Sequence, residues 1–171
     1  MGLKSIYVGI LTRVSLVPRP TLIVLLVCCL MSLSVSATNF DYQLRDLDGK
    51  LHKASDHRGQ WLVINFWATW CVPCLKEMPE LQQFSEQHRG KAQVWGVSFE
   101  DTDRNHIVEY VERLGITFPI LGYGQNPLTG YGEVRVLPTT FLIDPGGLFR
   151  HRFEGPITAQ DIVNEIERAG G

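Results

Sequence analysis

The chain has 171 residues, of which 44% are hydrophobic and 20% charged, and its formal net charge is −2. A chain of this length and composition can bury a hydrophobic core as one domain. It lacks the excess of basic residues that binding to nucleic-acid phosphates requires, so nucleic acids are excluded as partners.

Residues 1–37 have the pattern of a secretory signal peptide. All charges in this segment are basic and precede its apolar run: Lys4, Arg13 and Arg19. The apolar run, 21–31, is followed by small residues up to Ala37, after which we predict cleavage. An uncleaved signal anchor is the alternative, because 21–37 is at the short end of the roughly 17–25 residues that span a bilayer. Both alternatives place residues 38–171, as one domain, in the periplasm or another extracytoplasmic, oxidising compartment.

Two short strands and a long buried one are predicted next. Alternation over Phe40–Arg45, the turn residues Asp48 and Gly49, and a return over Lys50–Lys53 predict a β-hairpin. A polar connection, 55–60, leads to the nearly continuous apolar run Trp61–Phe66, which is typical of a central strand buried on both faces.

Helical spacing of apolar residues follows from Cys74 to His88, with Pro79 predicting a kink or an interruption. Gln93–Phe99 then reads as a buried strand, and Asp103–Leu114 as an amphipathic helix that Gly115 ends. Ile116–Leu121 reads as a short strand, and 122–132 as a glycine-rich loop or short helix.

The last third predicts a hairpin and a helix. Thr139–Ile143 reads as a strand, 144–147 as a tight turn and Leu148–Phe153 as an antiparallel return. Thr158 and Asp161 form a capping-box pattern that opens the final helix. This order of elements predicts an α/β fold with a central mixed sheet flanked by helices and preceded by an N-terminal β-hairpin.

The candidate active site is Cys71-Val-Pro-Cys74, at the junction between the central strand and the helix that follows. A helix N-terminus carries free N–H groups and a partial positive charge, which stabilise the thiolate that attacks disulfides. A purely structural disulfide is the plainer reading, but so short a loop suits exchange better than stapling.

Zinc binding is a further alternative for two cysteines at this spacing. Zinc needs about four ligands, and no cysteine follows Cys74. The histidines are scattered and contain no pair spaced for zinc: His52, His57, His88, His106 and His151. We therefore predict no metal site.

Three motifs together resemble the thioredoxin fold. They are Asn-Phe-Trp-Ala-Thr-Trp-Cys-Val-Pro-Cys at 65–74, the Glu77 that follows, and Leu-Pro-Thr-Thr-Phe-Leu-Ile-Asp at 137–144. Within that fold, residues 38–168 are similar to the exported TlpA/ResA-type thiol–disulfide oxidoreductases. The resemblance implies that Cys71 is an exposed nucleophile and Cys74 a buried resolving thiol.

The resemblance also implies a substrate-binding surface made of four residues: Trp70, Pro73, Leu137 and Pro138. Pro138 matches a proline that is cis in the family, and the Leu137 backbone would pair with an extended client segment. A proline that merely starts an edge strand is the alternative. Val136 departs from the glycine that many relatives have two residues before the proline.

Asn65 is a second departure, because thioredoxins carry an aspartate there that handles the proton of the buried cysteine. An amide does not titrate, so we hypothesise that Glu77, three residues after Cys74, has a raised pKa and moves that proton. The alternative is a solvated glutamate near the helix dipole.

The predicted function is an exported reductase of client disulfides. The resemblance implies apocytochromes c or copper-site proteins as clients, a membrane thiol-transfer protein as electron donor, no cofactor, and a monomer. The absence of histidine between the cysteines favours a reducing role. The alternatives are a disulfide oxidase or isomerase and a non-enzymatic Cu(I)-binding assembly factor. A thiol peroxidase is disfavoured because the Pro-x3-Thr-x2-Cys pattern is missing.

Overall fold

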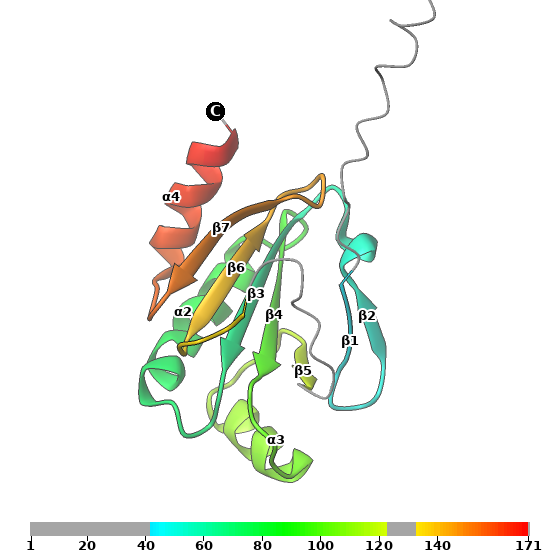
Figure 1. Ribbon diagram of the computed structural model, residues 1–171, viewed down its shortest axis with the longest axis vertical. Helices are drawn as coiled ribbons and strands as arrows, with labels where there is room; N and C mark the ends of the chain where they lie inside the picture. Colours follow the sequence, from blue (N-terminus) through cyan, green and yellow to red (C-terminus); the bar gives the residue numbers. More distant parts are fainter. Residues whose placement is uncertain (1–41, 123–132, 171) are drawn as a thin grey trace, which may run out of the picture. The chain divides into compact units, whose positions relative to one another are not determined.

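The apolar run that follows the polar connection forms the middle strand of a five-stranded mixed sheet (Figure 1). The computed structural model describes residues 42–122 and 133–170. The strand order is β5–β4–β3–β6–β7, with the bounds β3 (Trp61–Trp67), β4 (Ala92–Ser98), β5 (Ile120–Gly122), β6 (Thr139–Ile143) and β7 (Phe149–Glu154). Strand β3 pairs in parallel with β4 and antiparallel with β6, so the predicted mixed sheet is confirmed.

Alternate residues of the central strands belong to two different cores, one on each face of the sheet. Val63 and Trp67 pack in one core with residues of three helices: α2 (Val72–Gln87), α3 (Arg104–Arg113) and α4 (Ala159–Gly170). Leu62 and Ile64 pack in the other core, with residues of the N-terminal hairpin segment. This explains why β3 reads as a continuous apolar run: both of its faces are covered.

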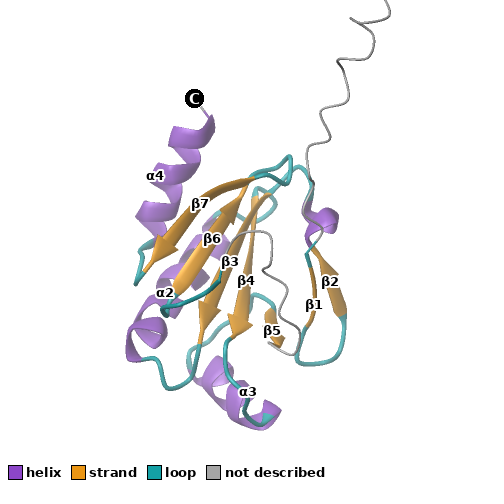
Figure 2. Ribbon diagram, viewed as in Figure 1, coloured by secondary structure: helices purple, strands orange, loops and turns teal. Residues whose placement is uncertain are grey.

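The N-terminal hairpin is present and confirms that part of the prediction. Strand β1 (Gln43–Arg45) pairs antiparallel with β2 (Leu51–Lys53), and a short 3-10 helix, η1 (Ala54–His57), follows (Figure 2). At the turn Gly49 has a φ of 82°, a conformation that glycine adopts without strain. The 3-10 helix overlaps the start of the predicted polar connection, 55–60.

Several predicted boundaries differ from those observed. Helix α2 begins at Val72 rather than Cys74, with Pro73 in its first turn. Proline fits there because the N–H groups of the first turn have no helical acceptor, so the N–H that proline lacks is not missed. The helix continues through Pro79, so of the two predicted effects, a kink or an interruption, the interruption is wrong. Strand β5 begins only at Ile120, since Pro119 cannot donate to a ladder.

The other elements lie within one or two residues of their predicted bounds, except that β1 begins at Gln43, three residues after the predicted Phe40. The capping box is confirmed: the Thr158 N–H donates to Asp161 Oδ2 at 2.8 Å, and the Asp161 N–H donates to Thr158 Oγ1 at 3.3 Å. The predicted leader, 1–37, the first part of the predicted strand, 40–41, and the predicted loop at 123–132 lie outside the described residues. In the described part of the chain, no helix is long and apolar enough to cross a membrane.

Close packing on β4 leads to a first prediction. A Cβ at Gly96 would lie 2.7 Å from Ile120 Cδ1, 3.1 Å from Phe118 Cε2 and 3.2 Å from Trp67 Nε1. We expect Gly96→Ala to lower the free energy of unfolding by about 1–3 kcal/mol, because ring atoms must move as well as a flexible methyl group. Urea unfolding measures the change. The matched control is Gly122→Ala, whose Cβ would have its nearest neighbour among the described residues, the Arg45 carbonyl oxygen, at 3.9 Å, and an equal loss there would contradict the packing argument.

Candidate active site

The two cysteines close a disulfide at the start of α2, with a sulfur–sulfur distance of 2.00 Å. Cys71 is the N-cap residue of the helix, and its Sγ accepts a hydrogen bond from the Cys74 N–H at 3.3 Å. Strand β3 ends at Trp67, so a short turn carries the chain from the sheet to this cap. The sulfur therefore occupies the place where an anion is favoured at a helix N-terminus.

The exposure of Cys71 corrects one expectation. Cys71 is 5% exposed and Cys74 is 0% exposed, so Cys71 is the more exposed of the two, as predicted. The prediction that Cys71 is an exposed residue is nevertheless wrong for this disulfide form. Both residues belong to the core that packs against the helices. In the disulfide form, therefore, little of the Cys71 side chain is accessible to a partner.

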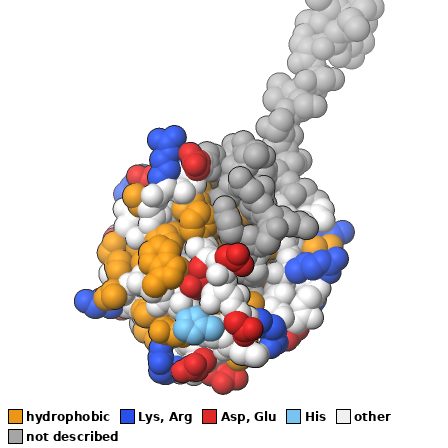
Figure 3. Space-filling view, turned by 60° about the horizontal axis from the view of Figure 1, so that its bottom comes forward, with side chains coloured by type: hydrophobic (Ala, Val, Ile, Leu, Met, Phe, Trp, Pro, Cys, Tyr) orange, Lys and Arg blue, Asp and Glu red, His pale blue; other side chains and the backbone are white. Residues whose placement is uncertain are grey.

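The residues beside the cysteines are far more exposed. Trp70 is 66% exposed and Val72 is 62% exposed, and Pro73 is also exposed. Figure 3 shows the end of the molecule where β3 stops and α2 begins, with hydrophobic side chains gathered on one side of it. Trp67, in contrast, is fully buried in the core, as its place in the central strand predicts. Adjacent exposed apolar side chains that form a patch are typical of surfaces that bind other proteins.

The segment before β6 contributes the other predicted substrate-binding residues. The Leu137–Pro138 peptide bond is cis, as the family resemblance implied. Pro138 is buried, and the half-buried Leu137 packs against the same core as the two cysteines. The exposed Val136 is held by its carbonyl, which accepts a hydrogen bond from the Thr139 hydroxyl at 2.7 Å.

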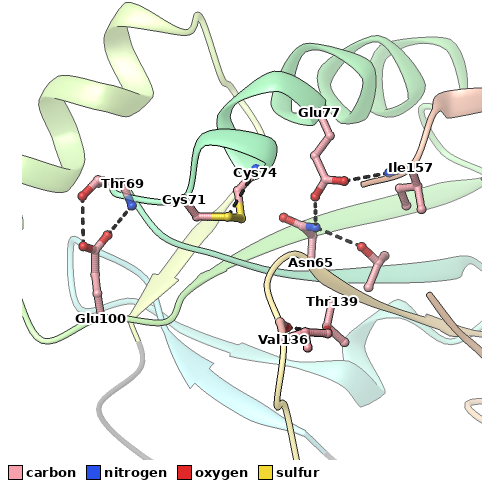
Figure 4. Close-up of a disulfide and its surroundings, with 10 residues drawn as sticks. Asn65, Thr69, Cys71, Cys74, Glu77, Glu100, Val136, Thr139 and Ile157 are labelled. Carbon is pink, nitrogen blue, oxygen red and sulfur yellow. Dashed lines mark hydrogen bonds between the residues drawn. A yellow bond between two sulfur atoms is a disulfide. The ribbon is translucent and has the colours of Figure 1, made fainter. Parts of the chain in front are cut away.

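Glu77 is buried behind the disulfide rather than solvated, since it is only 2% exposed. Its Oε1 accepts a hydrogen bond from the Asn65 amide at 2.7 Å, and its Oε2 accepts one from the Ile157 N–H at 2.9 Å (Figure 4). Burial raises the pKa of the Glu77 carboxyl from 4.5 to about 7, although these two hydrogen bonds oppose the rise. The group is therefore able to gain or lose a proton near neutral pH.

Asn65 connects this carboxyl to the rest of the site. Its Nδ2 donates to Glu77 and also to Thr140 Oγ1, at 2.9 Å, because the antiparallel register places Asn65 opposite Thr140. Its Oδ1 is buried without a hydrogen-bond partner among the described residues, and Figure 4 shows this oxygen on the side of the amide that faces the disulfide. The departure from aspartate thus replaces a second buried acid with a neutral donor to Glu77.

Sequence reasoning missed one group of residues at this site. Glu100, two residues after the end of β4, accepts hydrogen bonds from the Thr69 N–H at 2.7 Å and from the Thr69 hydroxyl at 2.9 Å. His106 Nε2 lies 3.1 Å from the same hydroxyl oxygen. The available signal was topological: β3 and β4 are parallel neighbours, so the segments after them meet at one edge of the sheet.

Residues 42–122 and 133–170 contain no group of three or more His, Cys, Asp or Glu side chains arranged to hold a metal ion. The chemistry that the described site can perform is that of its own sulfurs. A dithiol and a disulfide interconvert by thiolate attack, and this pair, with a titratable carboxyl behind it, has the parts for such an exchange.

Comparisons with known proteins agree with this chemistry. Residues 35–152 match the AhpC/TSA family. The thiol-disulfide oxidoreductase ResA of Geobacillus thermodenitrificans (strain NG80-2) is 34% identical over 137 residues, which cover 80% of this chain and 78% of that protein. A DsbF homologue from Corynebacterium diphtheriae matches in structure with a TM-score of 0.68 and 27% identity, over 75% of this chain and 83% of that one.

A third match is a secreted thiol-disulfide isomerase from Corynebacterium glutamicum, with a TM-score of 0.65 and 25% identity, over 72% of this chain and 80% of that one. The fold is therefore thioredoxin-like, and the protein is a thiol–disulfide oxidoreductase with a Cys71–Cys74 pair. The chain belongs to the AhpC/TSA family of thioredoxin-fold proteins, among the ResA-like members that the sequence motifs indicated.

Proposed function

We propose that this oxidoreductase is an exported reductase of client protein disulfides. The observation that carries the proposal is the Cys71–Cys74 pair at the N-terminus of α2, with the buried Glu77 carboxyl, of pKa about 7, one turn further along the helix. The helix end stabilises a thiolate, and the absence of histidine between the cysteines disfavours a strongly oxidising pair.

The reaction takes two exchange steps and needs no cofactor. The Cys71 thiolate attacks one sulfur of a client disulfide, which forms a Cys71–client mixed disulfide and releases the other client sulfur as a thiolate. The Cys74 thiolate then attacks Cys71 Sγ, which forms the Cys71–Cys74 disulfide and releases the second client thiolate. The client gains two electrons, and the protein loses two.

Glu77 is proposed to take the proton that Cys74 must lose before the second step. A carboxyl with a pKa of about 7 is a suitable acceptor near neutral pH, and Glu77 lies three residues after Cys74 on the same helix. The hydrogen bonds from Asn65 and Ile157 hold the carboxyl in place behind the disulfide.

The client is proposed to lie across an apolar surface. Trp70 and Pro73 are exposed beside the cysteines, and Leu137 and Pro138 come from the segment before β6. An extended client segment would pair with the backbone at Leu137 and place its disulfide at Cys71. The exposed Val136 would contact the same segment, and it is bulkier than the glycine of many relatives.

The compartment, the clients and the electron donor complete the proposal. The basic and apolar pattern of residues 1–37 supports export, with cleavage after Ala37 leaving the domain 38–171. Outside the cytoplasm a dithiol becomes oxidised unless it is re-reduced, so a membrane thiol-transfer donor is required. The resemblance to ResA-type proteins supports apocytochromes c or copper-site proteins as clients. The protein is proposed to act as a monomer.

The reduction potential of the Cys71–Cys74 pair tests the direction of electron flow. We expect equilibration in defined thiol buffers to give a value well below about −200 mV, in the range of reducing thioredoxin-fold proteins. A value near about −120 mV, where the strong oxidants lie, would make the protein a disulfide donor instead.

Disulfide isomerisation is the second candidate, because the secreted isomerase from Corynebacterium glutamicum is among the structural matches. An isomerase must act on scrambled proteins without consuming electrons. The two candidates separate in a refolding assay with a scrambled substrate: a reductase depends on a continuing supply of reductant, whereas an isomerase works at a fixed redox poise.

A further inference from the structure

The turn that leads from β3 to the nucleophile is fastened to the neighbouring strand by one carboxylate. Glu100 accepts from both the backbone N–H and the side-chain hydroxyl of Thr69, at 2.7 and 2.9 Å. Thr69 is buried and lies two residues before Cys71, while Glu100 is half-buried and lies two residues after the end of β4 (Figure 4). Hydrogen bonds to a charged acceptor are stronger than neutral ones, so this contact is firm.

The Thr69 hydroxyl also contacts His106, the third residue at this turn. A hydroxyl has one proton, and a carboxylate only accepts, so the Thr69 proton points to Glu100. His106 Nε2, at 3.1 Å from the hydroxyl oxygen, must then carry a proton and donate it to that oxygen. Helix α3 is thereby joined to the same turn through His106, whose ring also lies 5.1 Å from that of Tyr110.

We propose that Glu100 is a positioning residue that tunes the redox equilibrium of Cys71 and Cys74 by anchoring the turn at Thr69. In the disulfide form, Cys71 is held both by the bond to Cys74 and by this turn. In the dithiol form only the turn holds it. Loosening the turn gives the dithiol conformational freedom that the disulfide does not gain, so the balance moves toward the dithiol.

The test is the reduction potential of oxidised and reduced full-length protein in thiol buffers. Glu100→Ala removes both acceptor oxygens, and we expect the equilibrium constant for disulfide formation to fall about tenfold, the scale of freeing one residue's backbone. For a two-electron couple, a tenfold fall makes the potential about 30 mV less negative. Thr69→Val removes the two hydrogen bonds of the hydroxyl, to Glu100 and from His106, but keeps the bond from the Thr69 N–H to Glu100, so it should shift the potential in the same direction by less.

Conservative variants separate anchoring from charge. Glu100→Gln still accepts from the Thr69 N–H and can donate to its hydroxyl, so its shift should be well below that of Glu100→Ala. Thr69→Ser keeps the hydroxyl and should retain the wild-type potential. Asp101→Ala removes an exposed charge one residue further along and should also leave the potential unchanged. A shift in Glu100→Gln as large as in Glu100→Ala would assign the effect to charge and overturn the proposal.

A purely structural role of Glu100 would give a different result. It would lower the melting temperature of both redox forms equally and leave the potential of Glu100→Ala unchanged, which would overturn the proposal. The inference rests on the roles proposed above for Cys71 and Cys74, but the two fail separately. The wild-type potential tests the direction of electron flow, whereas the difference between variants tests the anchor.

Discussion

A Cys74→Ser variant should capture client proteins as stable mixed disulfides through Cys71 and should lose turnover to the background rate of the assay thiols. The reason is the order of the two steps: Cys71 performs the first attack, and without the Cys74 thiol no intramolecular attack releases the client. Non-reducing gels and mass spectrometry of the adduct, with a model disulfide protein as client, measure the capture.

The reverse variant is the matched control. Cys71→Ser leaves only Cys74, which is 0% exposed, so neither adduct nor turnover is expected. Capture by Cys71→Ser at the rate of Cys74→Ser would mean that the fully buried sulfur is the one that meets the client, and the assigned roles would then be reversed.

Replacing Glu77 with glutamine should remove a pH-dependent loss of stability. The folded-state pKa of about 7 lies above the ordinary value of 4.5, so the folded protein binds the extra proton between these values. The contribution of Glu77 to stability is therefore fully present below pH 4.5 and is lost as the pH rises through 7. A shift of this size corresponds to about 3 kcal/mol, and glutamine resembles the protonated carboxyl throughout.

Urea unfolding of the oxidised variant and wild type at pH 4.5 and pH 8 measures this effect. We expect the free energy of unfolding of Glu77→Gln, relative to wild type, to rise by about 3 kcal/mol between the two pH values. The matched control, Glu112→Gln on the exposed side of α3, should show no such change. If Glu77 also moves the Cys74 proton, the same variant alters the pH dependence of client reduction, and an unchanged profile would remove that role.

The described parts of the fold were largely predictable because each prediction depended on local patterns. The run Trp61–Phe66 is apolar since both faces of β3 are covered, and the Thr158–Asp161 capping box depends on residues three apart. The predicted starts of α2 and β5 differ from those observed because Pro73 and Pro119 determine them. The effect of a missing N–H depends on where the hydrogen bonds of the helix or strand begin, which the sequence alone does not show.

The site was predictable where a motif is contiguous and not where it is assembled by the fold. Cys74 and Glu77 lie in one helix and Cys71 is its N-cap, so spacing and the family resemblance brought them together. Glu100 and Thr69 are 31 residues apart, and their contact follows only from the pairing of β3 with β4. The low exposure of Cys71 also could not be inferred from the sequence, because it depends on the core that packs around the disulfide.

The hydrogen bond from Ile157 to Glu77 joins residues 80 positions apart. We expect this contact to form late in folding, because closing a long loop costs conformational entropy before the contacts that it brings together compensate for it. Burial raises the pKa of Glu77, and the segment around Ile157 contacts this carboxyl. A chain in which that segment has not yet docked is therefore expected to carry an ordinary Glu77 carboxyl and to lack the proposed proton acceptor for Cys74.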